Sequence, residues 1–252
     1  LLALIVWTIW GNTALMVNSI TVSGNQIPSE FSGFRIAQIS DLHNAEFGEG
    51  NSHLLNSLSE SKPDMIAITG DLVDAQHTNI DAALSFAEKA VQIAPVYYVT
   101  GNHEASLSQY SELKTGLEAA GVIVLEDKAI QLEHNGGIVT LMGLSDPNFT
   151  IKSNIFDEVP AMISTKLNDL MENKVGYTIL LSHRPELFDT YVSCGVDLVL
   201  SGHAHGGQFR LPLIGGLVAP NQGFFPKYDA GLYTNGGTNM VVSRGLGNSI
   251  IP

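Results

Sequence analysis

The sequence predicts an α/β fold in which a parallel sheet is covered by helices and is followed, within one domain, by a mixed second sheet. Two observations support this prediction. Short apolar, β-branched runs alternate with segments whose apolar residues recur every three or four positions, and this alternation is typical of parallel sheets. Later the chain changes to hairpin patterns. With 252 residues, of which 44% are hydrophobic, the chain can bury the core of such a domain.

The first half of the chain predicts three strand–helix pairs. Each strand is a short apolar run bounded by polar residues. Each helix carries apolar residues on one face, as Leu54, Leu55 and Leu58 do in the first of them. We expect the strands at residues 34–40, 64–69 and 96–100 and the helices at residues 50–62, 79–93 and 108–120.

The second half predicts the mixed sheet. Residues 129–143 have the pattern of a hairpin that turns at residues 135–137, where the sequence reads Asn-Gly-Gly. Pro185 suits the first turn of a short helix, and glycine-rich hairpins, such as residues 231–243, are expected after residue 208. A further helix is expected near residues 158–173, and further strands at residues 177–182 and 196–201.

Five of the predicted strands are each followed at once by residues that can bind a metal ion. In an open α/β sheet, ligands bind outside the carboxyl ends of the strands, so we expect these side chains to meet at one edge. Each motif alone also fits a polar loop, but the ordered set of five predicts a metal site. The candidate ligands are Asp41, His43, Asp71, Asn102, His183, His203 and His205.

The donor types restrict the metal. Asp, Asn and His supply oxygen and nitrogen donors and no cluster contains a cysteine, which suits Mn, Fe or Zn better than a soft metal. Seven ligands are too many for one tetrahedral zinc, so we expect two divalent or trivalent ions. The formal net charge of −13 argues against nucleic acid as a general partner. Two bound cations would instead supply the local positive charge that a phosphate needs.

The ordered motifs resemble those of a known family. The series "DLH", "GDLVD", "GNHE", "SH" and "GHAHGGQ" is similar to that of the calcineurin-like metallophosphoesterases, over residues 34–247. The forms "SGHAHGGQFRLP", "AGLY" and "VSRGLG" resemble more particularly the YkuE-like bacterial phosphoesterases, which are often membrane-anchored. The resemblance implies a four-layer α/β-β/α sandwich of two mixed sheets, with two metal ions between the strand ends.

The resemblance also implies a role for each candidate residue. The family pattern places His103 near the phosphate or the leaving group, as the catalytic residue rather than a ligand. It assigns the first metal to Asp41, His43, Asp71 and His205, and the second to Asp71, Asn102, His183 and His203. Asp71 would therefore bridge the two metals.

The predicted function is that of a dinuclear metal-dependent phosphohydrolase. A metal-bound hydroxide is expected to attack phosphorus directly, with phosphodiester or pyrophosphate bonds as the substrates. A phosphomonoesterase for small metabolites is one alternative. A catalytically inactive metal-binding scaffold is another, although the complete ligand set opposes it. Ala75 stands where the phosphoprotein phosphatase branch has an arginine, which argues against a protein serine/threonine phosphatase.

Residues beside the motifs are expected to support the ligands. Asn44 and Glu104 are candidates for holding them in place. Asp74 is predicted either to orient His103 or to cap a helix. Arg184 is expected to form an ion pair rather than to take part in catalysis.

The first ten residues carry no charge and one polar side chain, Thr8. A membrane-spanning helix needs about 20 apolar residues, so this run predicts the end of such a helix at residues 1–17, or else a buried strand or helix end. The single catalytic domain would then comprise residues 18–252. On this basis we expect a membrane-associated protein, with the extracytoplasmic face favoured, that acts on a lipid-linked or cell-envelope phosphate ester.

Overall fold

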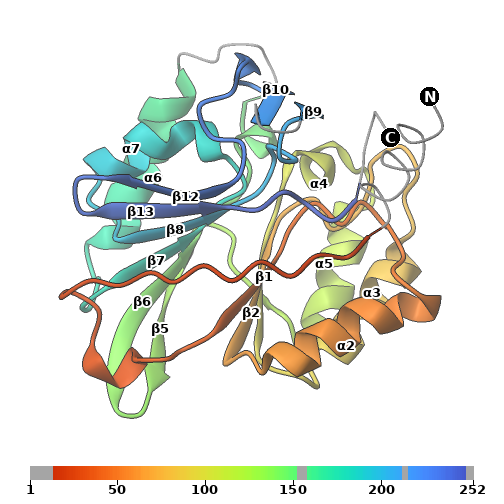
Figure 1. The fold of residues 1–252 in the computed structure, drawn as a ribbon, viewed down its shortest axis with the longest axis horizontal. Coiled ribbons are helices and arrows are strands. Elements are labelled where there is room, and N and C mark those ends of the chain that lie inside the picture. The colour runs from red at the N-terminus through yellow and green to blue at the C-terminus, as the bar shows by residue number, and fades with distance from the viewer. Residues whose placement is uncertain (1–13, 152–157, 212–214, 248–252) are drawn as a thin grey trace.

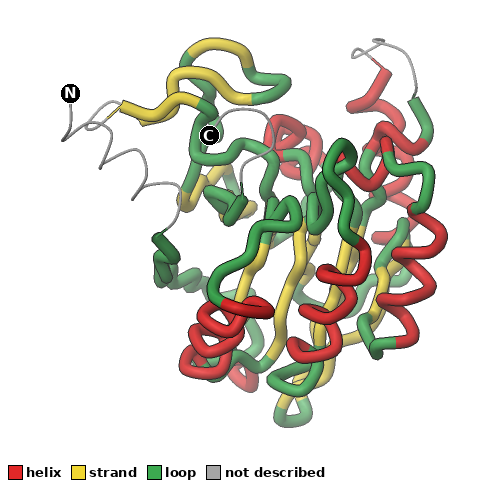
Figure 2. Tube along the Cα trace, turned by 90° about the vertical axis from the view of Figure 1, so that its right-hand side faces the viewer, coloured by secondary structure: helices red, strands yellow, loops and turns green. Residues whose placement is uncertain are grey.

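The computed structural model describes residues 14–151, 158–211 and 215–247. Two sheets lie face to face, and helices cover the outer face of each (Figure 1). Figure 2 shows the helices in red packed along the strands. The arrangement is the predicted four-layer α/β-β/α sandwich, so the fold class is confirmed.

The first sheet contains four parallel strands in the order β1-β2-β3-β4. It differs in one detail from the expectation of two mixed sheets, because it is parallel throughout. Its strands are β1 (Ile36–Ile39), β2 (Met65–Thr69), β3 (Val96–Val99) and β4 (Ile123–Val124). The helices that connect them are η2 (Glu49–Asn51), α2 (Ser52–Ser61), α3 (Ile80–Ala90), α4 (Asn102–Ser106) and α5 (Tyr110–Ala119).

The second sheet has six strands in the order β12-β13-β8-β7-β6-β5. Its inner pairs are parallel and its two outer pairs are antiparallel hairpins, so it is mixed, as predicted. The strands are β5 (Lys128–His134), β6 (Gly137–Gly143), β7 (Thr178–Leu181), β8 (Leu198–Ser201), β12 (Gly231–Asn235) and β13 (Thr238–Val242). The helical segments of this half are η3 (Pro147–Phe149), α6 (Val159–Met171), η5 (Pro185–Leu187) and α7 (Phe188–Ser193), and η1 (Ser29–Phe31) precedes β1.

A small antiparallel sheet, which the sequence did not predict as a separate unit, follows β8. It consists of β9 (Phe209–Leu211), β10 (Gly215–Ala219) and β11 (Gly223–Phe224) in the order β11-β10-β9. In Figure 1 it lies at the same end of the molecule as α4.

Side-chain alternation along the strands divides the core into three layers. In β2, Ile66 and Ile68 belong to the cluster that packs on α2, α3 and α5, whereas Met65 and Ala67 face the second sheet. This is the period of two expected for a strand covered on both faces. Burying a side chain of this size contributes about 1.5–3 kcal/mol. The sandwich therefore follows from strands that carry apolar side chains on both faces.

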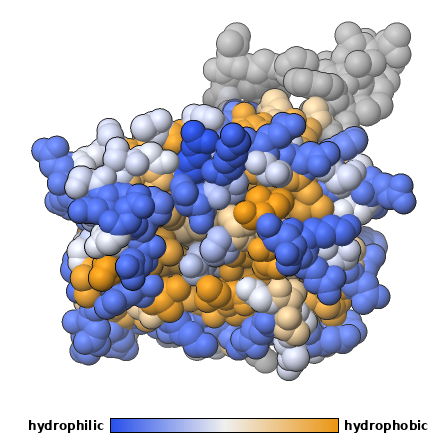
Figure 3. Space-filling model, turned by 90° about the horizontal axis from the view of Figure 1, so that it is seen from below, coloured by the Kyte–Doolittle hydropathy of each residue, from blue (hydrophilic) through white to orange (hydrophobic). Residues whose placement is uncertain are grey.

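Apolar side chains also reach the surface. The face in Figure 3 mixes hydrophilic side chains with hydrophobic ones, as is normal for a folded chain. Ile138 and Val175 are among the exposed large hydrophobic residues of the described part. Single exposed apolar residues are therefore not by themselves signs of function.

The prediction of membrane association is wrong on the structural findings. Within residues 14–151, 158–211 and 215–247, no helix is both long enough and apolar enough to cross a membrane. The apolar run at residues 1–10, on which the prediction depended, lies outside the described residues. The division into residues 1–17 and 18–252 stays a prediction.

Candidate metal centre

The seven predicted ligands converge where β1, β2, β3, β7 and β8 end. The Nε2 atoms of His43 and His205 lie 3.3 Å apart, although the two residues are 162 positions apart in the chain. His183 Nε2 lies 3.2 Å from Asn102 Oδ1 and 3.2 Å from His203 Nδ1. Asp41 Oδ1 is 3.3 Å from His205 Nε2. The five sequence motifs thus form one cluster.

Asp71 lies between two halves of this cluster. Asp41, His43 and His205 form one group of potential ligands, with ligand atoms within 4.8 Å of one another, and Asp71, His183 and His203 form another. A third such group joins His43, Asp71 and His103. Asp71 Oδ2 is 3.2 Å from His183 Nε2 and 3.7 Å from His43 Nε2. Its place matches the bridging position that the resemblance implies.

The donor set fits bound cations. A neutral imidazole has one N–H, so the two ring nitrogens of His43 and His205, 3.3 Å apart, are better satisfied by a cation between their lone pairs than by each other. His183 Nε2 and His203 Nδ1, which lie 3.2 Å apart, belong to the second group of potential ligands. His43 Nδ1 is buried without a hydrogen-bond partner.

Burial and charge set the protonation of these groups. Burial lowers the pKa of His43 to about 4, and burial together with the Arg184 charge lowers that of His203. Burial also opposes charge on His183, but the Asp71 carboxylate outweighs it and raises the His183 pKa to about 10. Burial would raise the pKa of Asp71, yet His183 and His43 lower it. Asp71 therefore stays ionised, as a ligand carboxylate must.

The backbone is strained at the ligands themselves. A positive φ is uncommon for a residue other than glycine, and each instance costs about 1–3 kcal/mol. Such strain clusters at functional sites, where it aims side chains that ordinary turns would not. The ligand candidates with positive φ are Asp41 (52°), His43 (48°), Asp71 (51°), His203 (66°) and His205 (52°).

Glycine allows two of these turns to approach one another. A Cβ atom at Gly101 would collide with the side chain of Asp71, and one at Gly202 would collide with Ser40 and Asp41. At Gly101 the Cβ would also lie 2.7 Å from the backbone nitrogen of Asp71, and at Gly202 it would lie 3.0 Å from the Cβ of Ser40. We conclude that these two glycines permit the close approach of the strand ends.

The family model for calcineurin-like phosphoesterases matches residues 34–207 of this chain. The chain belongs to the calcineurin-like phosphoesterase family. It is therefore a metallophosphoesterase, and its clusters of Asp and His can hold the metal ions that such enzymes use. The resemblance stated from the motifs is confirmed.

Individual proteins support the same assignment. The phosphoesterase is 29% identical over 237 residues to the uncharacterized metallophosphoesterase YkuE of Bacillus subtilis, covering 92% of this chain and 78% of that protein. It is 27% identical over 220 residues to the phosphodiesterase YaeI of Escherichia coli, covering 85% and 76%. Its fold is similar to that of phosphopantetheinyl hydrolase from Mycobacterium tuberculosis (TM-score 0.55, 15% identity, 84% and 90% covered).

Glu104 holds two of the ligand turns of the phosphoesterase together. It is fully buried, and its carboxylate accepts the backbone N–H groups of Asp71 (2.9 Å), Val73 (3.2 Å) and Gly101 (2.7 Å). Burial and the charge of Asp71 raise its pKa to about 7. The predicted supporting role of Glu104 agrees with these contacts.

Asn44 has a similar role on the other side of the cluster. Its Oδ1 accepts the N–H groups of Asp74 and Asn79, both at 3.1 Å, and its Nδ2 donates to Asn79 O at 2.8 Å. These bonds fix the segment that follows Asp71. The side chain of Asn44 therefore supports the turn that follows Asp71 by binding the backbone of that turn, as predicted.

His103 lies at the rim of the cluster. Its backbone N–H donates to Asp71 Oδ1 at 2.9 Å, and its Nδ1 accepts the N–H of Ala75 at 3.0 Å. Because Nδ1 is an acceptor, the neutral ring carries its hydrogen on Nε2. The side chain is 14% exposed. A reacting group can therefore approach it from solvent.

Asp74 lies beside His103 but does not cap a helix. Its Oδ2 is 3.5 Å from His103 Nδ1. Its Oδ1 accepts the N–H groups of Gln76 and His77, each at 2.8 Å. The carboxylate thus lies beside His103 while it closes the turn that follows Asp71, and no helix begins at that turn.

Sequence reasoning missed an ion-pair network behind His203. Arg184 is buried and binds Asp146 through two contacts, Nε–Oδ2 at 2.6 Å and Nη2–Oδ1 at 2.9 Å. Its Nη1 lies 2.9 Å from His203 Nε2, and Asn221 Nδ2 lies 3.1 Å from the same atom. Arg184 was expected to form an ion pair, but Asp146 and Asn221 lie outside every motif. The network fixes the ring of His203.

We expect Arg184→Met to destabilise the phosphoesterase by about 3–5 kcal/mol, since it leaves the buried Asp146 carboxylate without a partner. Urea unfolding measures the change. Adding Asp146→Leu should restore part of the loss, because the unpaired charge is then removed. A loss below about 1 kcal/mol for Arg184→Met would contradict the role of this pair.

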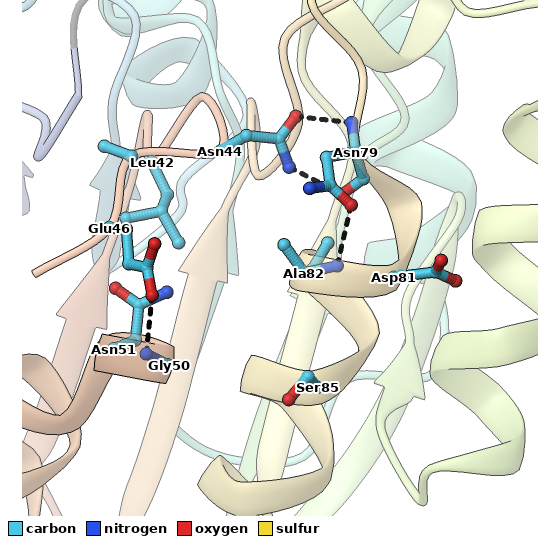
Figure 4. Close-up of a pocket in the computed structure, with 11 residues that line it drawn as sticks. Leu42, Asn44, Glu46, Gly50, Asn51, Asn79, Asp81, Ala82 and Ser85 are labelled. Atoms are coloured by element: carbon cyan, nitrogen blue, oxygen red, sulfur yellow. Dashed lines mark hydrogen bonds between the residues drawn. The ribbon is translucent and has the colours of Figure 1, made fainter. Parts of the chain in front are cut away.

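A cleft of about 470 Å³ lies beside the centre. Figure 4 shows it between the segment after β1 and the start of α3, with Asn44 and Asn79 hydrogen-bonded to each other. Leu42 and Asn44, the neighbours of His43, line its inner end. Open space therefore reaches the residues that flank the cluster, and its lining mixes polar and apolar residues.

Proposed function

We propose that this phosphoesterase hydrolyses phosphodiester or pyrophosphate bonds with two metal ions, of the type Mn, Fe or Zn. The observation that carries the proposal is the position of Asp71 between two groups of ligands, with His103 at the rim. The first ion would be held by Asp41, His43, Asp71 and His205, and the second by Asp71, Asn102, His183 and His203. The name of the relative YaeI, a phosphodiesterase, favours the same class of reaction.

Two bound metal ions would lower the pKa of a water molecule and neutralise charge on the phosphoryl group. Within the chain, Asp71 orients His103 by accepting its backbone N–H. Ala75 keeps the hydrogen of the neutral His103 ring on Nε2, where it can be donated to a leaving oxygen. An ester whose leaving oxygen is strongly basic, such as an alkoxide, benefits from this donor because that oxygen needs a proton.

The proposal is tested by a substrate screen. The protein is loaded in turn with Mn, Zn and Fe and assayed on bis(p-nitrophenyl) phosphate, p-nitrophenyl phosphate and pyrophosphate. We expect faster turnover of the diester. Faster turnover of the monoester would overturn the proposed bond type and favour a phosphomonoesterase. A metal-loaded protein that hydrolyses neither ester nor pyrophosphate would indicate a binding scaffold.

We expect His103→Ala to lower turnover by about 100- to 10,000-fold, the usual contribution of a general acid or base, while both metals stay bound. His77→Ala is the matched control, because His77 is also near Asp74 but its side chain is 85% exposed. Metal content by elemental analysis and kcat are measured together. Loss of metal from His103→Ala would instead make His103 a ligand, as the group His43, Asp71 and His103 allows.

A further inference from the structure

The small sheet is seated directly on the turn that carries two of the proposed ligands. The N–H of Gln208 donates to Val218 O at 2.7 Å. A Cβ atom at Gly216 would lie 2.9 Å from Gly207 Cα, so β10 crosses the turn after His205 at backbone contact. Asn221, just after β10, places its Nδ2 3.1 Å from His203 Nε2. The loop after β10 thus begins at the metal centre.

This loop is closed firmly at its base. The Gln222 side chain donates to Tyr228 O and accepts the Tyr228 N–H, both at 2.8 Å. Tyr228 is buried, and its ring packs edge-on against Phe188 and Tyr233. Residues 223–227 therefore run between fixed ends, and the first two of them form β11, which pairs with β10.

Two adjacent phenylalanines, Phe224 at the end of β11 and Phe225 after it, lie in this segment. Phe224 is 81% exposed and Phe225 is 72% exposed. Phe225 has a φ of 54°, an outlier for a bulky aromatic residue, and its N–H donates to Leu217 O at 2.8 Å. Single exposed apolar residues are normal, but two adjacent rings on an anchored, strained loop serve no packing within the described chain. Strain of this kind clusters at ligand-binding segments.

Phe224 is three residues along the chain from Asn221, whose side chain contacts a proposed ligand, His203. Three residues span at most about 11 Å, so the Phe224 backbone is no farther than that from Asn221, whose side chain contacts His203. An ester whose phosphate lies at the metal centre has its organic group a few ångströms away. An apolar group on that side would meet the two rings.

We propose that Phe224 and Phe225 form the apolar edge of the substrate site and bind the aromatic or aliphatic group esterified to the phosphate. This inference rests on the proposed function. It names a substrate class, an apolar phosphate ester, and two residues that set the preference for it. Aromatic rings favour such groups through offset or edge-to-face contacts as well as through burial.

The test compares two competitive inhibitors that share one head group, 1-naphthylphosphonate and methylphosphonate. The wild-type protein should bind the naphthyl compound about 10-fold or more tightly, and Phe224→Ala/Phe225→Ala should lose most of that ratio. Ile123→Ala is the control, because Ile123 is 40% exposed on the edge strand β4 of the other sheet. Binding to the metal-loaded protein is also measured by titration calorimetry, which needs no turnover.

The outcomes separate the two proposals. A ratio that is unchanged in the double variant overturns the role of the rings, whatever the turnover. A change of molecular mass in solution with an unchanged ratio would make the patch a contact between copies of the chain and also overturn it. Absence of hydrolysis by the wild type refutes the proposed function instead. Because the ratio compares two ligands on one preparation, a partial loss of folded protein does not change it.

Discussion

Asp71→Ala is expected to remove both metal ions and to abolish hydrolysis. Asp71 is buried and belongs to two of the groups of potential ligands, so its carboxylate is the charge that the proposed metals share. Removing a residue that merely orients a ligand costs about 10- to 100-fold in metal affinity or activity. The loss of a shared ligand should therefore exceed about 100-fold in both quantities.

Elemental analysis and turnover on a diester measure this effect on the same preparation. Asp71→Asn preserves the shape of the side chain and an acceptor for the His103 N–H. A loss of metal and of turnover in this variant as well would therefore be due to the lost charge and not to a change in the fold. Asp189→Ala, on an exposed carboxylate, is the control for general effects of acid removal. Two metals and near-normal turnover in Asp71→Asn would contradict the bridging role.

Glu104→Ala is expected to lower the free energy of unfolding by about 3 kcal/mol or more. The change leaves three buried backbone N–H groups without an acceptor, at Asp71, Val73 and Gly101, and each such group costs about 1–3 kcal/mol. This is a large part of the total stability of a domain, about 5–15 kcal/mol. The loosened turns carry Asp71 and Asn102, so metal affinity should also fall.

Urea unfolding and metal titration of the same variants test this expectation. Glu104→Gln keeps one acceptor oxygen and should lie between the wild type and the alanine variant. Glu118→Ala, an exposed acid on α5, should change neither quantity. Unfolding of Glu104→Ala at the wild-type urea concentration would show that these three bonds do not hold the turns.

The sequence predicts the residues of the cluster because each motif lies beside the strand that precedes it in the chain. Each ligand follows an apolar run directly, as Asp71 follows β2 and His203 follows β8. Parallel pairing brings the carboxyl ends of β1, β2 and β3 to one edge of the first sheet and those of β7 and β8 to one edge of the second. The packing of the two sheets then joins these edges. The turn of the β5–β6 hairpin, at Asn135 and Gly136, is likewise visible in the sequence.

The supporting residues could not be predicted because they act across the chain. Asp146 pairs with Arg184 from 38 positions away, and Asn221 reaches His203 from the loop after β10. Neither stands at the end of a predicted strand, and neither residue type is unusual in a loop. The separate small sheet was missed because its strands, of two to five residues, are too short for a clear period. The contacts of Asp146 with Arg184 and of Asn221 with His203 were therefore hidden from the sequence.

The number of metal ions bound per folded chain tests the central claim most directly. The wild-type protein is saturated with Mn or Zn, freed of loosely bound ions, and analysed for metal and protein on one sample. Two ions per chain, both lost from Asp71→Ala, are predicted. One ion or fewer in the wild type, or two ions retained without Asp71, would contradict the account of two metals joined by this carboxylate.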